Sequence, residues 1–343
     1  MGHPNVIKGE IVKEYLDRLM TESQGDIKIY KRTLALKIFN ENPGVFKDVE
    51  EVRSKIRYYT GSYGKRERER NTIKKYLDIF PNPYGFPEPE QDMEFSAEPY
   101  ELPSYCQSVG IIGDLHIPYH DIPSITASFN WMKEHKVDTI LINGDLIDCY
   151  QLSNFEKDPR RRDMAGEIKN VIEFFDILRS NFPDARIFYR KANHEYRWER
   201  YMMLKAYELL NIPDFKFDNV LKLKYFDITP IPHKTRIKIG ECFVLHGDEY
   251  NARMSPDLAH PARWLYLKTK CNAIAGHFHR VSEYVEPNLQ DKTSATWTIG
   301  CLCNLHPFWL PYNKWGHGFA RIRLHKDGRF DVTNLKIIEG KVY

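Results

Sequence analysis

Apolar residues recur at the spacing of an α-helix through the first sixty positions of the chain. This period of three to four residues predicts helices over residues 6–20, 33–41 and 49–59. The second helix is expected to end before Pro43, because proline disfavours a helical conformation in the residue that precedes it. Asp48 can cap the third helix by accepting a hydrogen bond from a backbone N–H of its first turn. The pattern therefore predicts a small all-α region.

From residue 105 onward, short apolar and β-branched runs alternate with helical patterns. Strands are predicted over 108–112, 139–143, 186–190, 236–239, 242–245, 273–275, 296–301 and 319–324. Helices are predicted over 124–135, 165–180, 196–209 and 257–269. Asp327-Gly328 suits a hairpin turn that joins the last strands. Alternation of this kind is typical of layered α/β proteins.

A proline-rich, acidic stretch separates the two patterns. Residues 81–104 hold six of the twenty prolines of the chain and six acidic residues. Such a segment is stiff and extended and does not form a core. We therefore expect three parts: a helical domain over 1–80, a linker over 81–104 and a larger domain over 105–343.

The composition is close to that of an ordinary globular protein. Of the 343 residues 42% are hydrophobic and 28% are charged, which excludes a disordered tail or a collagen-like fibre. No apolar run reaches the roughly 18 residues that span a bilayer, and the first residues do not resemble a secretory signal. We therefore expect a cytoplasmic protein with no membrane association. The six cysteines show no disulfide spacing, and Cys301 and Cys303 are expected to be buried thiols.

Positive charge is concentrated in one short segment. Residues 28–75 contain fourteen Lys/Arg and six Asp/Glu, a local charge of +8 within a chain whose net charge is +3. Two short helices around a tight turn resemble a helix-turn-helix, which favours DNA as a partner. The alternative is a helical bundle with a solvated basic face, used for assembly, for instance as a homodimer. The candidate contacts to nucleic acid are Arg53, Lys55, Arg57, Lys65 and Arg66.

Five polar clusters each directly follow a predicted strand. In α/β proteins the loops at the carboxyl ends of strands converge on one crevice, so the clusters are expected to meet. Imidazole and carboxylate together favour Mn, Fe or Zn over Ca or Mg, and seven candidate ligands suit two ions better than one. The clusters are Gly113-Asp114-Leu115-His116, Asn143-Gly144-Asp145-Leu146-Ile147-Asp148, Ala192-Asn193-His194-Glu195, Leu245-His246-Gly247-Asp248 and Gly276-His277-Phe278-His279.

In this order the clusters resemble the signature of the calcineurin-like metallophosphoesterases. The resemblance covers residues 105–340 and implies a β-sandwich flanked by helices, with two divalent metal ions, Mn foremost, at its edge. It implies Asp114, His116 and His279 as ligands of the first metal, and Asn193, His246 and His277 as ligands of the second, with Asp145 as the bridge. His194 matches the histidine above the scissile phosphate, and Asp148 matches the carboxylate that orients it.

Two positions depart from the family signature. Ala192 stands where a glycine usually precedes Asn-His, a change expected to cost only backbone freedom. Cys149-Tyr150 stands where the protein Ser/Thr phosphatases of the superfamily carry Arg-Gly, so their phosphate-binding arginine is missing and that function is disfavoured. The candidate replacements are Arg160, Arg161, Arg162, Arg197 and Arg200.

The dimetal site and the basic helical segment together favour a phosphodiesterase that hydrolyses DNA through a hydroxide bridging the metals. One alternative is a phosphomonoesterase, or a phosphodiesterase for small molecules such as cyclic nucleotides. A third hypothesis is a non-catalytic DNA-binding regulator. We expect core or rim packing for Trp309, Tyr312 and Trp315, with stacking against bases as the alternative.

Overall fold

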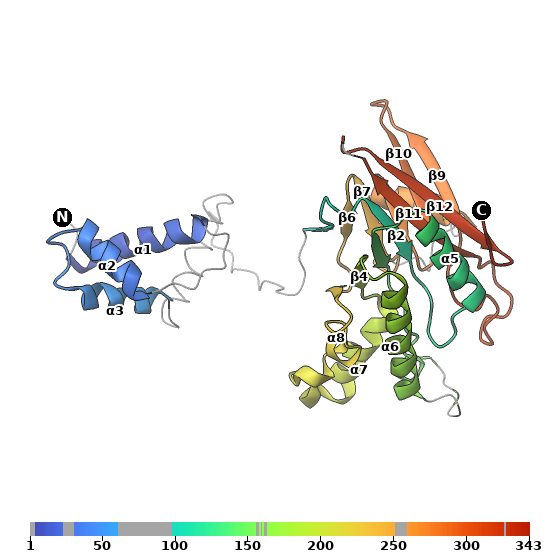
Figure 1. Ribbon diagram of the computed structural model, residues 1–343, viewed down its shortest axis with the longest axis horizontal. Coiled ribbons are helices and arrows are strands. Elements are labelled where there is room, and N and C mark those ends of the chain that lie inside the picture. The colour runs from blue at the N-terminus through green and yellow to red at the C-terminus, as the bar shows by residue number, and fades with distance from the viewer. Residues whose placement is uncertain are drawn as a thin grey trace, which may run out of the picture. The chain divides into compact units, whose positions relative to one another are not determined.

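The computed structural model describes residues 4–22, 31–60, 98–155, 158, 160, 163–250, 259–325 and 327–343 (Figure 1). The chain divides into two compact units, an N-terminal unit of residues 1–91 and a C-terminal unit of residues 92–343. Most of the predicted linker lies outside the described residues, as do Lys65, Arg66, Arg161 and Arg162.

The N-terminal unit contains the three predicted helices. They are α1 (Pro4–Glu22), α2 (Lys31–Glu41) and α3 (Val49–Thr60). Their apolar faces meet in a small core in which Val12, Ile38 and Ile56 are completely buried. Asp48 caps α3 as predicted, since its Oδ1 accepts a hydrogen bond from the N–H of Glu51 at 2.8 Å. The helical pattern of the sequence is therefore confirmed in this unit.

The C-terminal unit is built on two β-sheets. The seven-stranded sheet has the order β13 (Lys341–Val342), β12 (Phe330–Ile338), β11 (His317–Leu324), β2 (Ser108–Ile112), β3 (Thr139–Ile142), β4 (Arg186–Arg190) and β5 (Ile228–Ile231). The six-stranded sheet has the order β1 (Tyr100–Glu101), β6 (Ile237–Ile239), β7 (Cys242–Leu245), β8 (Ala273–Ala275), β10 (Thr293–Thr298) and β9 (Ser282–Pro287). Strands β2 to β5 run parallel, as do β7 and β8, while β11 and β12 form an antiparallel hairpin at the predicted position.

The apolar pattern of the strands explains how the layers pack. On β2, Val109 and Ile111 belong to the core between the two sheets, whereas Ile112 belongs to a second core against the helices. This second core includes apolar residues of α5 (Ile122–Glu134) and α6 (Met164–Asn181). The outer face of the six-stranded sheet is covered by α9 (Pro261–Thr269), from which Trp264 is buried. The predicted α/β sandwich flanked by helices is confirmed.

The structure differs from the sequence prediction at a strand inside the expected linker and at the start of one helix, among other places. Tyr100–Glu101, at the end of the stretch assigned to the linker, pairs with β6, and Leu102 is buried in the core between the sheets. Helix α7 (Asn193–Lys205) begins three residues before the predicted start and is followed by the short helix α8 (Phe217–Val220). It starts early because Glu195 closes its first turn by accepting a hydrogen bond from the N–H of Ala192 at 2.8 Å. None of the described helices is long and apolar enough to cross a membrane.

Candidate metal centre and substrate cleft

The five polar clusters lie at the carboxyl ends of parallel strands. Three follow β2, β3 and β4 of the seven-stranded sheet, and two follow β7 and β8 of the six-stranded sheet. Contacts across the edge join the two sets: Asp114 meets His279, and Asp145 meets His246, each pair with its nitrogen and oxygen 3.2 Å apart. The two sheets therefore bring the predicted ligands to one place.

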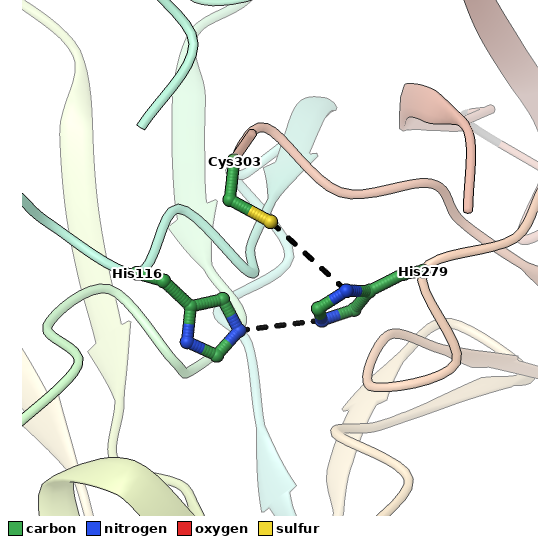
Figure 2. Close-up of side chains that lie close together, drawn as sticks. All are labelled: His116, His279 and Cys303. Carbon is green, nitrogen blue, oxygen red and sulfur yellow. Dashed lines mark hydrogen bonds between the residues drawn. The ribbon is translucent and has the colours of Figure 1, made fainter. Parts of the chain in front are cut away.

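One half of the site is formed by Asp114, His116 and His279. His279 Nε2 lies 3.2 Å from Asp114 Oδ1 and 3.3 Å from His116 Nε2. Figure 2 shows the two imidazoles turned toward each other, with the thiol of Cys303 next to both of them; the ligand atoms of His116, His279 and Cys303 all lie within 4.8 Å of one another. The Cys303 Sγ is 4.0 Å from His279 Nδ1, so this thiol contacts the ring nitrogen that points away from Asp114.

The other half contains Asn193, His246 and His277, with Asp145 between the halves. Oxygen Oδ2 of Asp145 lies 3.2 Å from His246 Nε2 and 3.9 Å from His116 Nε2. The ligand atoms of Asp145, His246 and His277 all lie within 4.8 Å of one another. One carboxylate thus faces both groups of imidazoles, which is the position that a bridging ligand requires.

A buried polar atom in this second half supports a metal site. Asn193 Oδ1 is fully buried and finds no hydrogen-bond partner among the described residues. A buried polar atom without a partner costs about 1–3 kcal/mol, so such atoms call for an explanation. The combination of imidazole nitrogens, carboxylates and an amide oxygen fits divalent transition metals. The seven predicted ligands, Asp114, His116, Asp145, Asn193, His246, His277 and His279, therefore form a set that could hold two such ions.

The pKa values follow from burial and neighbouring charge. Burial disfavours the charged form of Asp145, but the imidazoles of His194 and His246 outweigh it and hold the pKa of this carboxyl well below its usual range. Burial, with the charge of His246 beside it, lowers the pKa of His277 to about 4. At neutral pH Asp145 is therefore an ionised carboxylate and His277 a neutral imidazole, the forms that bind metal. Neighbouring acidic side chains raise the pKa values of His246 and His279, so that a bound metal would displace their protons.

His194 and Asp148, predicted to act on the departing oxygen, also lie together. His194 Nδ1 is 3.1 Å from Asp148 Oδ1 and 2.9 Å from the backbone oxygen of Asp148. Burial opposes protonation of His194, but the carboxylates of Asp145 and Asp148 outweigh it and raise its pKa. Asp148 therefore fixes the tautomer of His194, and the imidazole can hold a proton for transfer.

The arginines proposed to replace the missing phosphate-binding arginine differ in whether they line the cleft. Arg197 lines the cleft, donating to the Asp148 carbonyl at 2.8 Å and lying 2.9 Å from His194 Nε2. Arg160 also lines the cleft, but it is bound to Asp158 through Nε and an Nη. Arg200 is not part of the cleft wall in the described structure. Of the three candidates that the structure describes, Arg197 is thus the one best placed to take over phosphate binding.

The backbone explains why alanine is tolerated at position 192. Ala192 has an extended conformation with φ −128°, which any residue adopts. Glycine is instead required at position 144, because φ there is +91° and a Cβ would approach the Ala192 Cβ to 2.4 Å. The departure from the signature therefore needs no strained backbone.

Two residues that support the site, Glu195 and Cys303, had no predicted role. Glu195 is 1% exposed and accepts hydrogen bonds from the N–H groups of Asp145 and Leu146 and from the Tyr189 hydroxyl. It thereby connects the loop that carries Asp145 to the helix that carries His194, and its place in the Asn-His-Glu cluster was the available signal. Cys303 was expected to be a buried thiol, which it is, but its contact with His279 had no sequence signal.

A cleft of about 980 Å³ opens over these residues. Its wall includes His116, Asp145, His194, His277 and His279, so the polar cluster lies at its surface. The remaining wall is rich in aromatic side chains, namely Tyr119, Tyr150, Phe155, Phe308, Trp309 and Trp315. The space is comparable to that of ligand pockets of roughly 300–1,000 Å³.

Comparison with known proteins agrees with this geometry. The family model described as calcineurin-like phosphoesterase matches residues 108–328. The chain therefore belongs to the calcineurin-like phosphoesterase family. No curated protein matches the chain.

Several solved structures are similar to the chain at low identity. A single-substitution variant of Vps29 from Entamoeba histolytica is 14% identical, with 69% of this chain and 96% of that chain covered and a TM-score of 0.35. A dimetal phosphatase from Danio rerio is 12% identical, with 72% and 98% covered and a TM-score of 0.33. The phosphoesterase Yfce from E. coli is 11% identical, with 66% and 98% covered and a TM-score of 0.27.

Proposed function

We propose that this family member is a metal-dependent phosphodiesterase that hydrolyses nucleic acid, DNA foremost. The observation that carries the proposal is the cleft of about 980 Å³, whose wall combines the predicted ligand cluster with six aromatic side chains. A phosphate group alone would occupy a small part of this space. Aromatic side chains next to a phosphate site are what a nucleotide, with its flat base, would use.

In this proposal the bound cations, Arg197, His194 and Asp148 have different roles in hydrolysis. Two divalent cations, Mn foremost with Fe or Zn as alternatives, would supply a nucleophilic water at neutral pH and offset phosphate charge when bound. Arg197 would bind a phosphoryl oxygen in place of the missing arginine, since its guanidinium lies beside His194. His194 would give its proton to the departing oxygen, and Asp148 would hold the imidazole in the required tautomer.

The N-terminal unit would bind the same nucleic acid in this proposal. Its support is the local charge of +8 over residues 28–75. One observation favours the alternative of a small-molecule phosphodiesterase: Arg53 and Arg57 both bind Glu50, each at 3.1 Å, which reduces the charge offered to DNA.

A substrate panel tests the proposal. With Mn²⁺ present, purified protein is incubated with linear duplex DNA, circular single-stranded DNA, RNA, a cyclic nucleotide and 4-nitrophenyl phosphate, and Asp145→Ala serves as the control. We expect cleavage of DNA that the substitution abolishes. Hydrolysis of the monoester or the cyclic nucleotide alone would reject the nuclease proposal. Full activity of Asp145→Ala would reject the metal assignment.

A further inference from the structure

Large aromatic side chains are exposed at one end of the cleft. Phe308 and Trp309, here called the aromatic wall, are 84% and 51% exposed. Phe155, which lines the same cleft from another loop, is 70% exposed. Exposed apolar area of this kind is unfavourable in water, and its concentration at a polar site marks a binding surface. Trp309 packs edge-on against Tyr119 at the rim of the cleft, in line with our expectation, and about half of its surface is available to a ligand.

The loop that carries the aromatic wall is fixed by its own polar groups. Asn313 Nδ2 donates to the carbonyls of Leu305 and Leu310 at 2.6 and 2.8 Å, and Asn313 Oδ1 accepts from the N–H of Trp315 at 2.8 Å. The N–H of Leu310 donates to the Pro307 carbonyl at 3.0 Å, directly around the wall. A loop braced in this way presents its aromatic rings in a set position, which lowers the entropy cost of binding.

The same loop is anchored to the candidate metal centre at both ends. At one end, the N–H of Asn304 donates to the carbonyl of Tyr119 at 2.8 Å, and the ring of Tyr119 meets Trp309 edge-on with centroids 5.7 Å apart. At the other end, the N–H of Gly316 donates to the carbonyl of His279 at 2.8 Å. The Trp315 ring lies 4.2 Å from the His279 imidazole. The aromatic wall is therefore held at a fixed place relative to the phosphate site.

We propose that the aromatic wall binds an unpaired nucleobase of the nucleotide next to the scissile phosphate, so that the enzyme acts on single-stranded nucleic acid or unpaired ends. This inference rests on the proposed phosphodiesterase activity. Every base has a flat π-face, and stacking on an aromatic ring is therefore tolerant of sequence. Within a duplex both faces of the base are already stacked on neighbouring bases, so only an unpaired base offers a face to Trp309.

The first experiment varies the base while the leaving group stays constant. The full chain with Mn²⁺ is given the 5′- and 3′-(4-nitrophenyl phosphates) of thymidine and methyl 4-nitrophenyl phosphate, which has no base. We expect kcat/KM to be about tenfold or more higher for at least one thymidine ester. Equal values for all three diesters would overturn the aromatic-wall inference and leave the phosphodiesterase activity standing. No hydrolysis of any diester would overturn the proposed function itself.

The second experiment varies the wall. Trp309→Ala and Phe308→Ala should each reduce the ratio of kcat/KM between the thymidine ester and the methyl ester by about fivefold or more, and Trp309→Phe should retain most of it. Tyr312→Ala is the matched control, because Tyr312 lies on the same loop, is 93% exposed and is not part of the cleft wall. An unchanged ratio in both wall variants would overturn the inference. So would an equal loss in Tyr312→Ala, which would indicate a general effect on the loop.

A binding measurement gives an answer that does not depend on turnover. In EDTA, the anisotropy of fluorescein-labelled oligothymidylate is compared with that of an abasic oligomer of equal length, whose phosphates are the same. We expect the base-bearing oligomer to bind more tightly, and Trp309→Ala to remove most of the difference. Equal affinity of the wild-type chain for the two oligomers would overturn the inference.

Discussion

The charged residues that the sequence assigns to a function lie in opposite environments in the two units of the chain. In the C-terminal unit, Asp114 and Asp145 are 0% and 1% exposed, and their carboxylates contact imidazoles and backbone N–H groups of the site. In the N-terminal unit, Arg53 and Arg57 lie on the surface of α3 and bind the neighbouring Glu50. A buried carboxylate is costly unless something balances its charge, whereas a surface ion pair contributes only about 0–1 kcal/mol. The burial of Asp114 and Asp145 therefore indicates a function for these carboxylates. The exposed position of Arg53 and Arg57 indicates no particular function.

The largest effect is expected from the carboxylate that lies between the halves of the site. Asp145→Asn keeps the shape but removes the charge that faces His116, His194 and His246. We expect hydrolysis to fall on the order of a thousandfold, because Asp145 is the carboxylate that faces the imidazoles of both halves of the site. Steady-state kinetics and metal content by mass spectrometry measure the effect. Two bound metal ions per chain with wild-type turnover would contradict the assignment.

The second-largest effect is expected at Glu195, which supports the site without being a predicted ligand. Glu195→Gln weakens the hydrogen bonds to the N–H groups of Asp145, Leu146 and Ala192. We expect a loss of about 10–100-fold in metal affinity or kcat, as for other groups that orient ligands. Glu199→Gln is the matched control, because Glu199 lies one turn further along α7 and its carboxylate is 42% exposed beside Lys191. Equal losses in both variants would point to a general weakening of α7.

A smaller effect is expected at Cys303, whose thiol lies within 4.8 Å of a ring nitrogen of His116 and of His279. Cys303→Ala removes the thiol 4.0 Å from His279 Nδ1, so the imidazole loses a contact that orients it. We expect metal affinity, measured by competition with a chelator, to fall about three- to tenfold while the fold is retained. Cys106→Ala is the matched control, since Cys106 is equally buried but belongs to the core between the sheets. If Cys106→Ala weakens metal binding as much, Cys303 has no specific role.

The order of strands and polar clusters made the site predictable from the sequence. Each cluster follows an apolar run, and the carboxyl ends of parallel strands meet, so Asp145 and His246 could be placed together although 101 positions apart in the printed sequence. The strands that were not predicted have weaker patterns. Strand β9, for example, alternates between half-buried and exposed residues, so it presents no continuous apolar run.

The cleft wall could not be predicted in the same way. Phe308 and Trp309 lie in a loop whose position depends on contacts with Tyr119 and His279, far away in the sequence. An aromatic run in a loop has the same composition whether it packs in a core or faces a cleft. The contact of Cys303 with His279 likewise arises from the path of a loop, which no local pattern encodes.

The smallest effect is expected in the N-terminal unit. The experiment tests whether Arg53 and Arg57 contact DNA or only bind Glu50. Glu50 binds both Arg53 and Arg57, so Glu50→Gln would release two guanidinium groups at the surface of α3 without removing any basic residue. If this face binds DNA, affinity should rise about two- to threefold, and the dependence of log Kd on log salt concentration should steepen by about one unit. Glu173→Gln, on α6 of the other unit, changes net charge equally and is the matched control. Anisotropy titrations at several salt concentrations measure both quantities. An identical response of the two variants would mean that only net charge matters, and a DNA-binding role for α3 would then have to be given up.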